Sequence, residues 1–581
     1  MMRLFITALI ICWQFDVFAQ QSNVPLNYEW LQETEAKMVE HRGFNLSVGL
    51  MNYSADTSLS SLYDSLFYTS KRSDEVTIAY PIHSGMRPWI EQGHALRHNV
   101  SAHNTFQRRT TYNKTFGSWV RQYYSWGSLL QVEKPATYNT PLFRLYINPL
   151  IHAQSTTLLN DTSTERLYIN TRGVTARGDI GTKISFETTF IENQAFLPAW
   201  QDSFAMHYGV IPGQGRWKRF KQTGYDYASA FGTLSYSPFR LLNIQIGNDK
   251  LFVGDGIRSL LWSDRAFNFP HARITLWSDA SRILQYTMVY ASLMNLTAGG
   301  VTTPPGTERL FQKKPAAFQH LSVRIGRFGQ IGLFQGLIWN RTDSTNRQSL
   351  NFHYFNPVIF SSLPAFGLGD TVNYLIGVNY RFNIIKRISV YGQFMLDEFS
   401  GSKQLRSKGG LQVGLKYFNA FFIPHLHVQV EYNQVRPFAY SCRDSLQAWT
   451  HYNQSIAHPL GANFKEWLVA LQYKIGPVFL HARYSSAEIG ANGSNVNNGQ
   501  NPFWSDNFPG SAGPYTIGSG VSGKLVTADV ELGMVFNHAT NLNLSVGYNY
   551  RNRTYGSLEQ NTGMIYVTFR TSLFNLGHDY F

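Results

Sequence analysis

One stretch of the sequence holds charged residues and glycines densely enough to suggest a site. Residues 247–264 read GNDKLFVGDGIRSLLWSD, with Arg258 among several glycines and aspartates. An arginine can form paired hydrogen bonds to carboxylates, and a buried arginine needs such partners. Polar side chains grouped in this way could also bind sugar hydroxyls. We therefore predict that the stretch folds inward and pairs Arg258 with one or more of Asp255, Asp264 and Asp226, in a structural or a glycan-binding role.

Other residues with catalytic or ligating chemistry give weaker patterns. The sequence has neither a Gly-x-Ser-x-Gly elbow nor a His-Glu-x-x-His motif. His425 and His427 would share one face of a strand, but they have no evident third ligand, so we interpret them as polar lining. Residues 213–215 (GQG) lack the strand and helix of a phosphate loop and are expected to form a turn. We predict no catalytic residue, no metal site and no cofactor; a barrel hydrolase is the enzymatic alternative.

The composition favours a β-rich membrane protein. Charged residues make up 15% of the 581 residues, against about 25% in average soluble domains. The chain holds 33 Tyr and 41 Phe, yet after its first residues no stretch has the ~20 apolar residues of a spanning helix. Strands that alternate lipid-facing and lumen-facing side chains give this composition. The net charge of +14 suits a polar lumen, or contact with lipopolysaccharide phosphates or an acidic glycan.

The first 19 residues have the features of a secretory signal peptide. Arg3 precedes an apolar run over residues 4–13, and residues 17–19 (VFA) offer a cleavage site. The run is too short to span a bilayer. Cleavage would leave Cys442 as the single cysteine, so no intramolecular disulfide can form. Nucleic acid is not expected as a partner of an exported chain.

Residues 20–135 differ from the rest of the chain. Residues 28–41 (YEWLQETEAKMVEH) and 118–130 have spacings that are partly helical. We predict that residues 20–135 form a small, partly helical periplasmic segment that packs against the barrel mouth or plugs it.

From about residue 142, apolar and polar residues alternate with a period of two, as in strands with one apolar face. This pattern gives about 18 strands, an even number that leaves both termini in the periplasm. Short links such as 474–477 alternate with long polar links such as 433–466 and 486–523, which we expect to be extracellular. The sequence therefore predicts an all-β fold, a transmembrane antiparallel β-barrel over residues 136–581.

Several short motifs resemble the RemB-type gliding-motility outer-membrane proteins of Bacteroidetes, which are distantly similar to the capsule-assembly Wzi barrels. The resemblance covers roughly residues 80–581, and residues 254–264 are its most specific part. The other motifs are Asn170-Thr171-Arg172-Gly173, Glu192-Asn193-Gln194, Tyr225-Asp226-Tyr227 and the ending at residues 569–575.

The resemblance implies a non-enzymatic outer-membrane protein of a Gram-negative bacterium that organises the cell surface. Gliding motility is the first function it implies, capsule or exopolysaccharide assembly or attachment is the alternative, and a transport pore is a further one. Expected partners are the outer membrane, lipopolysaccharide, and surface polysaccharide or motility or secretion proteins. The resemblance also adds Arg172 to the predicted cluster of Asp226, Asp255, Arg258 and Asp264. Wzi-type barrels have 18 strands and a periplasmic helical plug.

Overall fold

The computed structural model describes the greater part of the chain from residue 130 onwards. The described ranges are 130–135, 141–159, 167–180, 183–239, 241–278, 283–298, 311–326, 328–339, 356–361, 372–385, 387–397, 408–475, 477–506, 515–537 and 542–571. The predicted signal peptide and the predicted helix over 28–41 lie outside them. Of the predicted helix over 118–130, only Leu130 is described, and it begins a strand.

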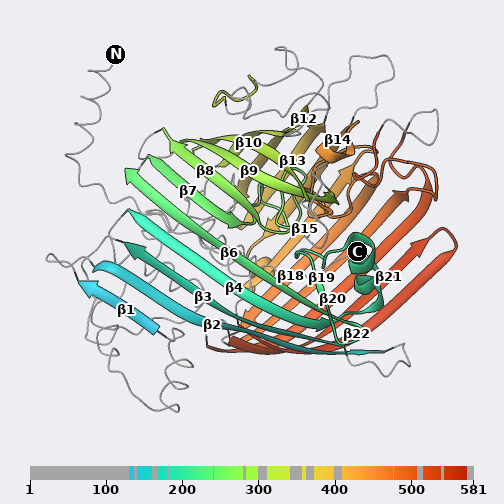
Figure 1. Ribbon diagram of the computed structural model, residues 1–581, viewed down its shortest axis with the longest axis horizontal. Helices are drawn as coiled ribbons and strands as arrows, with labels where there is room; N and C mark the ends of the chain where they lie inside the picture. The colour runs from blue at the N-terminus through green and yellow to red at the C-terminus, as the bar shows by residue number, and fades with distance from the viewer. Residues whose placement is uncertain are drawn as a thin grey trace, which may run out of the picture.

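In the described ranges, 18 long strands form one closed antiparallel barrel (Figure 1). Each strand pairs with the next along the chain, and β22 closes the barrel on β2, with His152 opposite Arg570. The predicted antiparallel barrel and its strand number are confirmed. The strands are β2 (Pro141–Leu158), β3 (Leu167–Ile180), β4 (Ile184–Phe196), β6 (Gly224–Phe239), β7 (Leu242–Asp249), β8 (Phe269–Trp277), β9 (Leu284–Ala298), β10 (Phe311–Ile325), β11 (Gly329–Trp339), β12 (Val372–Ile385), β13 (Ile388–Asp397), β14 (Lys408–Tyr417), β15 (Leu426–Val435), β18 (Phe464–Ile475), β19 (Val478–Ala491), β20 (Val521–Asn537), β21 (Leu542–Tyr555) and β22 (Leu558–Arg570).

Shorter elements add to the barrel wall and its connections. Strand β1 (Leu130–Pro135) pairs with the first half of β2, so these residues, which the sequence analysis assigned to the N-terminal segment, join the sheet. Strand β5 (Lys218–Phe220) pairs with the start of β6. The connections contain helix α7 (Ala199–Tyr208), the 3-10 turns η3 (Ala420–Phe422) and η4 (Ser445–Gln447), and a small hairpin of β16 (Thr450–His451) and β17 (Gln454–Ser455). None of the described helices is long and apolar enough to cross a bilayer.

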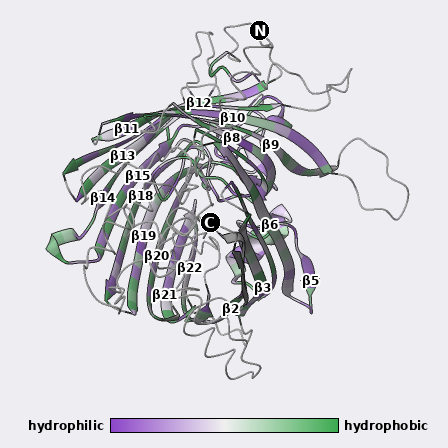
Figure 2. Cartoon of the chain, turned by 90° about the vertical axis from the view of Figure 1, so that its left-hand side faces the viewer, coloured by the Kyte–Doolittle hydropathy of each residue, from purple (hydrophilic) through white to green (hydrophobic). Residues whose placement is uncertain are grey.

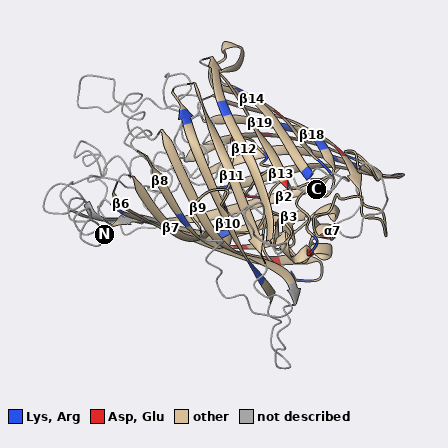
Figure 3. Cartoon of the chain, turned by 90° about the horizontal axis from the view of Figure 1, so that it is seen from above, with Lys and Arg blue, Asp and Glu red and all other residues tan. Residues whose placement is uncertain are grey.

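The strands place their apolar side chains on the outside of the barrel. On β20, Val530, Leu532, Met534 and Phe536 are 42–56% exposed, whereas Glu531 between them is buried. Burial alternates in the same way along β15. Apolar and polar residues follow one another along the strands (Figure 2), and charged residues are scattered thinly along them (Figure 3). A soluble barrel would bury its apolar face; a membrane barrel turns that face towards lipid.

His425 lies in the turn before β15, with φ of 62°, so it does not share a strand face with His427. The inward side of β15 instead carries His427, Gln429, Glu431 and Asn433, which are all buried.

The two ends of the barrel differ in the length of their connections. At one end, which we call the short-turn end, β3 is followed by β4 after three residues and β18 by β19 after two. At the other end, which we call the long-loop end, the connections include residues 197–223, 250–268, 436–463 and 492–520. In outer-membrane barrels the long loops are extracellular and the short turns periplasmic.

A hydrophobic core lies inside the barrel and is built largely by the long connections. Wall side chains alone do not fill so wide a barrel, so inserted segments can supply a core. Trp262 packs against Trp449, with ring centroids 5.6 Å apart, and against Phe269 and Phe318 of the wall. Tyr440 and Ile456 join the same buried cluster. The link over 433–466, predicted as a polar extracellular loop, is thus in large part an apolar insert.

Candidate functional site

The connection from β7 to β8, residues 250–268, folds into the barrel as a compact loop. Val253 and Trp262 form an isolated bridge, in which the Val253 N–H donates to the Trp262 carbonyl at 2.9 Å. The Ser259 hydroxyl donates to the Val253 carbonyl at 2.6 Å. From the wall, the amide of Gln393 donates to the Val253 carbonyl and accepts the Leu260 N–H. The loop backbone therefore obtains its hydrogen bonds from itself and from an inward side chain of β13.

Arg258 pairs with Glu466 on the inner face of β18. Its Nη2 lies 3.1 Å from Oε1 and its Nε 3.4 Å from Oε2. The two side chains are 3% and 2% exposed. Glu466 also accepts hydrogen bonds from His458 Nε2 at 2.9 Å and Asn433 Nδ2 at 3.1 Å. A buried ion pair is stable only with hydrogen bonds of this kind around it.

The histidine in this group is a neutral hydrogen-bond donor. Burial lowers the pKa of His458, and nearby Glu466 offsets this only in part. Its Nδ1 accepts the Leu460 N–H at 3.2 Å, so the proton of the neutral ring lies on Nε2 and is donated to Glu466. Arg258 is thus the charged partner of this carboxylate within the group.

A second carboxylate, Glu431 of β15, holds the tip of the loop through its backbone. Its side chain accepts the N–H groups of Ile257 at 2.8 Å and Arg258 at 3.1 Å. It also accepts the Tyr391 hydroxyl at 2.7 Å and an amide hydrogen of Gln412. We call Arg258, Glu466, His458, Glu431 and Asn433 the lumenal network. It joins loop 250–268 to two wall strands, β15 and β18, and to the connection over 436–463.

Gly256 fits into this network because it has no side chain. A Cβ there would lie 2.6 Å from the Arg258 carbonyl oxygen and from Glu431 Oε2. We expect Gly256→Ala to destabilise the folded barrel by roughly 1–3 kcal/mol through overpacking. A lower unfolding temperature and a smaller fraction of heat-modifiable, folded protein on gels would measure this. Gly493→Ala is the control, since its nearest contact would be an ordinary 3.4 Å. Equal stability of both variants would contradict the tight fit.

The sequence predicts that Arg258 pairs with one or more of three aspartates, and the structure adds Glu466 as a carboxylate that binds its guanidinium. Asp255 lies 3.2 Å from Arg381 of β12, and Asp264 lies 3.8 Å from Arg265.

Burial lowers the pKa of Lys250 in the same loop to about 8, and Asp264 counters that shift in part. No group of three or more His, Cys, Asp or Glu among the described residues is placed to hold a metal.

Arg172 and Asp226 do not belong to a lumenal cluster. Arg172 is 59% exposed on the outer face of β3 and lies 3.7 Å from Glu192 of β4. Its neighbour Thr171 points inward and is fully buried. Asp226 is the outward neighbour of inward-facing Tyr225 on β6. Successive strand residues face opposite sides, so a motif that spans both faces does not show which of its residues reach the lumen.

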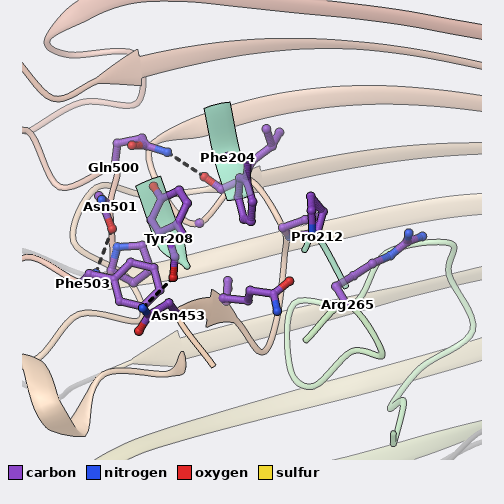
Figure 4. A pocket seen from close by; sticks show the side chains of 14 residues that line it. Phe204, Tyr208, Pro212, Arg265, Asn453, Gln500, Asn501 and Phe503 are labelled. Atoms are coloured by element: carbon purple, nitrogen blue, oxygen red, sulfur yellow. Dashed lines mark hydrogen bonds between the residues drawn. The ribbon is translucent and has the colours of Figure 1, made fainter. Parts of the chain in front are cut away.

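A second site, which we call the mouth pocket, lies where four long connections meet at the long-loop end (Figure 4). It encloses about 540 Å³, part of which is open to solvent. None of its residues was predicted from the sequence, where the one signal is an aromatic pair, Phe503 and Trp504, within a loop rich in Gly, Asn and Ser. The pocket is lined by Phe204, Tyr208, Pro212, Arg265, Asn453, Gln454, Ser455, Pro459, Leu460, Gly461, Gln500, Asn501, Pro502 and Phe503.

Aromatic rings and amides dominate the mouth pocket. Phe204 and Tyr208 lie one turn apart on α7 with ring centroids 4.6 Å apart, and Phe503 lies 5.9 Å from Tyr208 on its other side (Figure 4). The Asn453 side chain donates to the Tyr208 carbonyl at 2.9 Å. The Gln500 side chain donates to the Leu460 carbonyl at 3.0 Å. Apolar rings with a few fixed polar groups are the usual lining of a ligand pocket.

Comparison with protein-family models gave no match, and comparison with curated proteins gave none either. Among solved structures, the chain is similar to Wzi, described as an outer-membrane protein involved in group 1 capsule assembly in Escherichia coli and as a carbohydrate-binding β-barrel. That similarity has a TM-score of 0.51 and 11% identity, and covers 95% of this chain and 100% of Wzi. OprD of Pseudomonas aeruginosa (TM-score 0.38, 13% identity, 74% and 96% covered) and a BenF-like porin of Pseudomonas fluorescens (0.40, 11%, 74% and 99%) also match.

At 11% identity the similarity to Wzi establishes the fold and nothing finer. The fold agrees with the apolar outer face and with the contrast between short turns and long loops. The chain has the fold of outer-membrane β-barrels.

Proposed function

We propose that this protein is a non-enzymatic barrel that attaches or organises polysaccharide at the outer surface of a Gram-negative cell. The observation that carries the proposal is the build of the long-loop end, where the connections fold inward, pack on a core and leave the mouth pocket facing outward. Such a surface is suited to binding a ligand rather than to transporting it through the barrel. The solved barrel with a similar fold, Wzi, is described as carbohydrate binding and involved in capsule assembly.

The inserted loops argue against a transport pore. A pore needs a continuous passage, whereas residues 250–268 and 436–463 occupy the lumen and are mostly buried. Their buried side chains include Trp262 and Trp449, both fully enclosed. Opening a passage would require unpacking this core and the lumenal network together.

The proposal includes export by the predicted signal peptide and residence in the outer membrane. Gliding motility rests on the short motifs around residues 170–264 that resemble RemB-type proteins, and no feature of the described lumen or pocket favours it. Spreading of the cells is therefore measured as a second readout in the test of function.

The test compares source cells with and without the gene. We expect the deletion to shift surface polysaccharide from the cell pellet to the medium, because the attachment site is lost while synthesis continues. Cell-bound and released polysaccharide are quantified from the same culture, and spreading on agar is measured in parallel. Complementation with the intact gene should restore retention. Unchanged cell-bound polysaccharide together with lost spreading would replace the proposal with a motility role.

A further inference from the structure

We propose that the mouth pocket is a subsite for one pyranose unit of the surface polysaccharide, a sugar without positive charge whose ring lies against Tyr208 and Phe503. The inference rests on the proposed function and names the residues that would carry it. Three features of the pocket support it: the arrangement of its rings, its unused polar atoms, and its charge.

The rings of Tyr208 and Phe503 are tilted by 41° to one another and present apolar surface next to solvent. Tyr208 and Phe503 come from α7 and from the connection between β19 and β20, and both rings are partly exposed. Inside a protein, such rings would normally be covered by further apolar side chains. An aromatic face left open at a pocket can take the C–H face of a sugar ring, which is apolar, while the hydroxyls at the ring edge stay in reach of polar groups.

The polar groups of the pocket have hydrogen-bonding capacity that the described residues do not use. Ser455 is 9% exposed, and its hydroxyl has no hydrogen-bond partner in the described part of the chain. A buried hydroxyl without a partner is rare in folded proteins. Asn453 and Gln500 each donate one side-chain hydrogen bond to a loop carbonyl, and each side chain also carries a carbonyl oxygen that can accept one. These groups match the alternating donors and acceptors of sugar hydroxyls.

The charges around the pocket exclude cationic ligands. No aspartate or glutamate is among its lining residues, and Arg265 is the charged residue that lines it. Arg553 at the end of β21 acts on Tyr208 from outside the lining and lowers its pKa against the larger raising effect of burial. A neutral hexose or a uronic acid fits this environment, whereas an unacetylated amino sugar does not.

The test measures binding of the full-length barrel in detergent to surface polysaccharide extracted from the source cells and labelled at its reducing end. Fluorescence anisotropy gives Kd for the wild type and for Tyr208→Ala and Phe503→Ala. We expect each substitution to weaken binding by about tenfold or more, a loss of ~1.4 kcal/mol, and the double variant to abolish it.

The controls are neighbours of the same two residues. Met206 is 53% exposed on α7, and Trp504 is 38% exposed in the same loop as Phe503, and neither lines the pocket. Met206→Ala and Trp504→Ala should bind within about twofold of the wild type. If the wild type binds and all four variants bind equally, the subsite is elsewhere and the proposed function stands. If the wild type does not bind, the proposed function is wrong and the subsite with it.

Discussion

Arg258→Ala is expected to destabilise the folded barrel by about 3–5 kcal/mol, because it leaves a buried carboxylate without its charge partner. Glu466 would keep the hydrogen bonds from His458 and Asn433 but lose both bonds to the guanidinium. The loss would also loosen the tip of loop 250–268, whose backbone Glu431 holds beside Arg258. The unfolding temperature and the yield of heat-modifiable barrel measure the effect.

Two further variants separate the ion pair from a general arginine effect. Arg172→Ala removes an arginine from an exposed pair on the outer face, and such pairs contribute about 0–1 kcal/mol. The double variant Arg258→Met/Glu466→Met removes both charges, and it should recover much of the lost stability, since apolar replacement of a buried pair is often neutral. If Arg258→Ala were no less stable than Arg172→Ala, the lumenal network would have no structural role.

The barrel wall was predictable because its signal is local. A strand such as β20 or β15 shows its two faces within ten residues, and the lengths of the links between strands separate the two ends of the barrel. Neither feature requires knowledge of which residues meet across the lumen. The count of 18 strands followed from these patterns alone.

The interior was less predictable because it is built from residues far apart in the chain. Arg258 and Glu466 are separated by 208 positions, and several inward carboxylates were equally available to the arginine. Period-two alternation does mark Glu431 and Glu466 as inward residues, so the sequence could have indicated Glu466 as a partner. The mouth pocket joins α7 to residues near 453 and 500, and no local pattern predicts that junction.

Aromatic residues in the link over 433–466 indicate that it is buried, although its many polar residues suggested an exposed loop. Phe438, Tyr440 and Trp449 lie within it, and all three are fully buried. Large aromatic side chains in a long loop indicate an inserted core when the surrounding barrel is too wide for its wall to fill. The inserted loops thus follow from the same barrel width that the strand count implies.

Val530→Arg should show whether the apolar outer face meets lipid. Val530 lies near the middle of β20, is 43% exposed, and continues outward along the strand with Leu532 and Met534. An arginine on the lipid face of a barrel costs about 2–4 kcal/mol at the bilayer midplane. We therefore expect Val530→Arg to lower the fraction of barrel that inserts into liposomes of outer-membrane composition and to lower the stability of the inserted barrel.

The matched substitution Val496→Arg makes the same chemical change in a connection at the long-loop end, where Val496 is 39% exposed. Water solvates an arginine there, so insertion and stability should match the wild type. The two valines are almost equally exposed. A difference in insertion and stability between the variants therefore shows whether lipid or water surrounds each position. Equal tolerance of arginine at both positions would mean that water surrounds the middle of β20, and the outer face would then need another apolar partner.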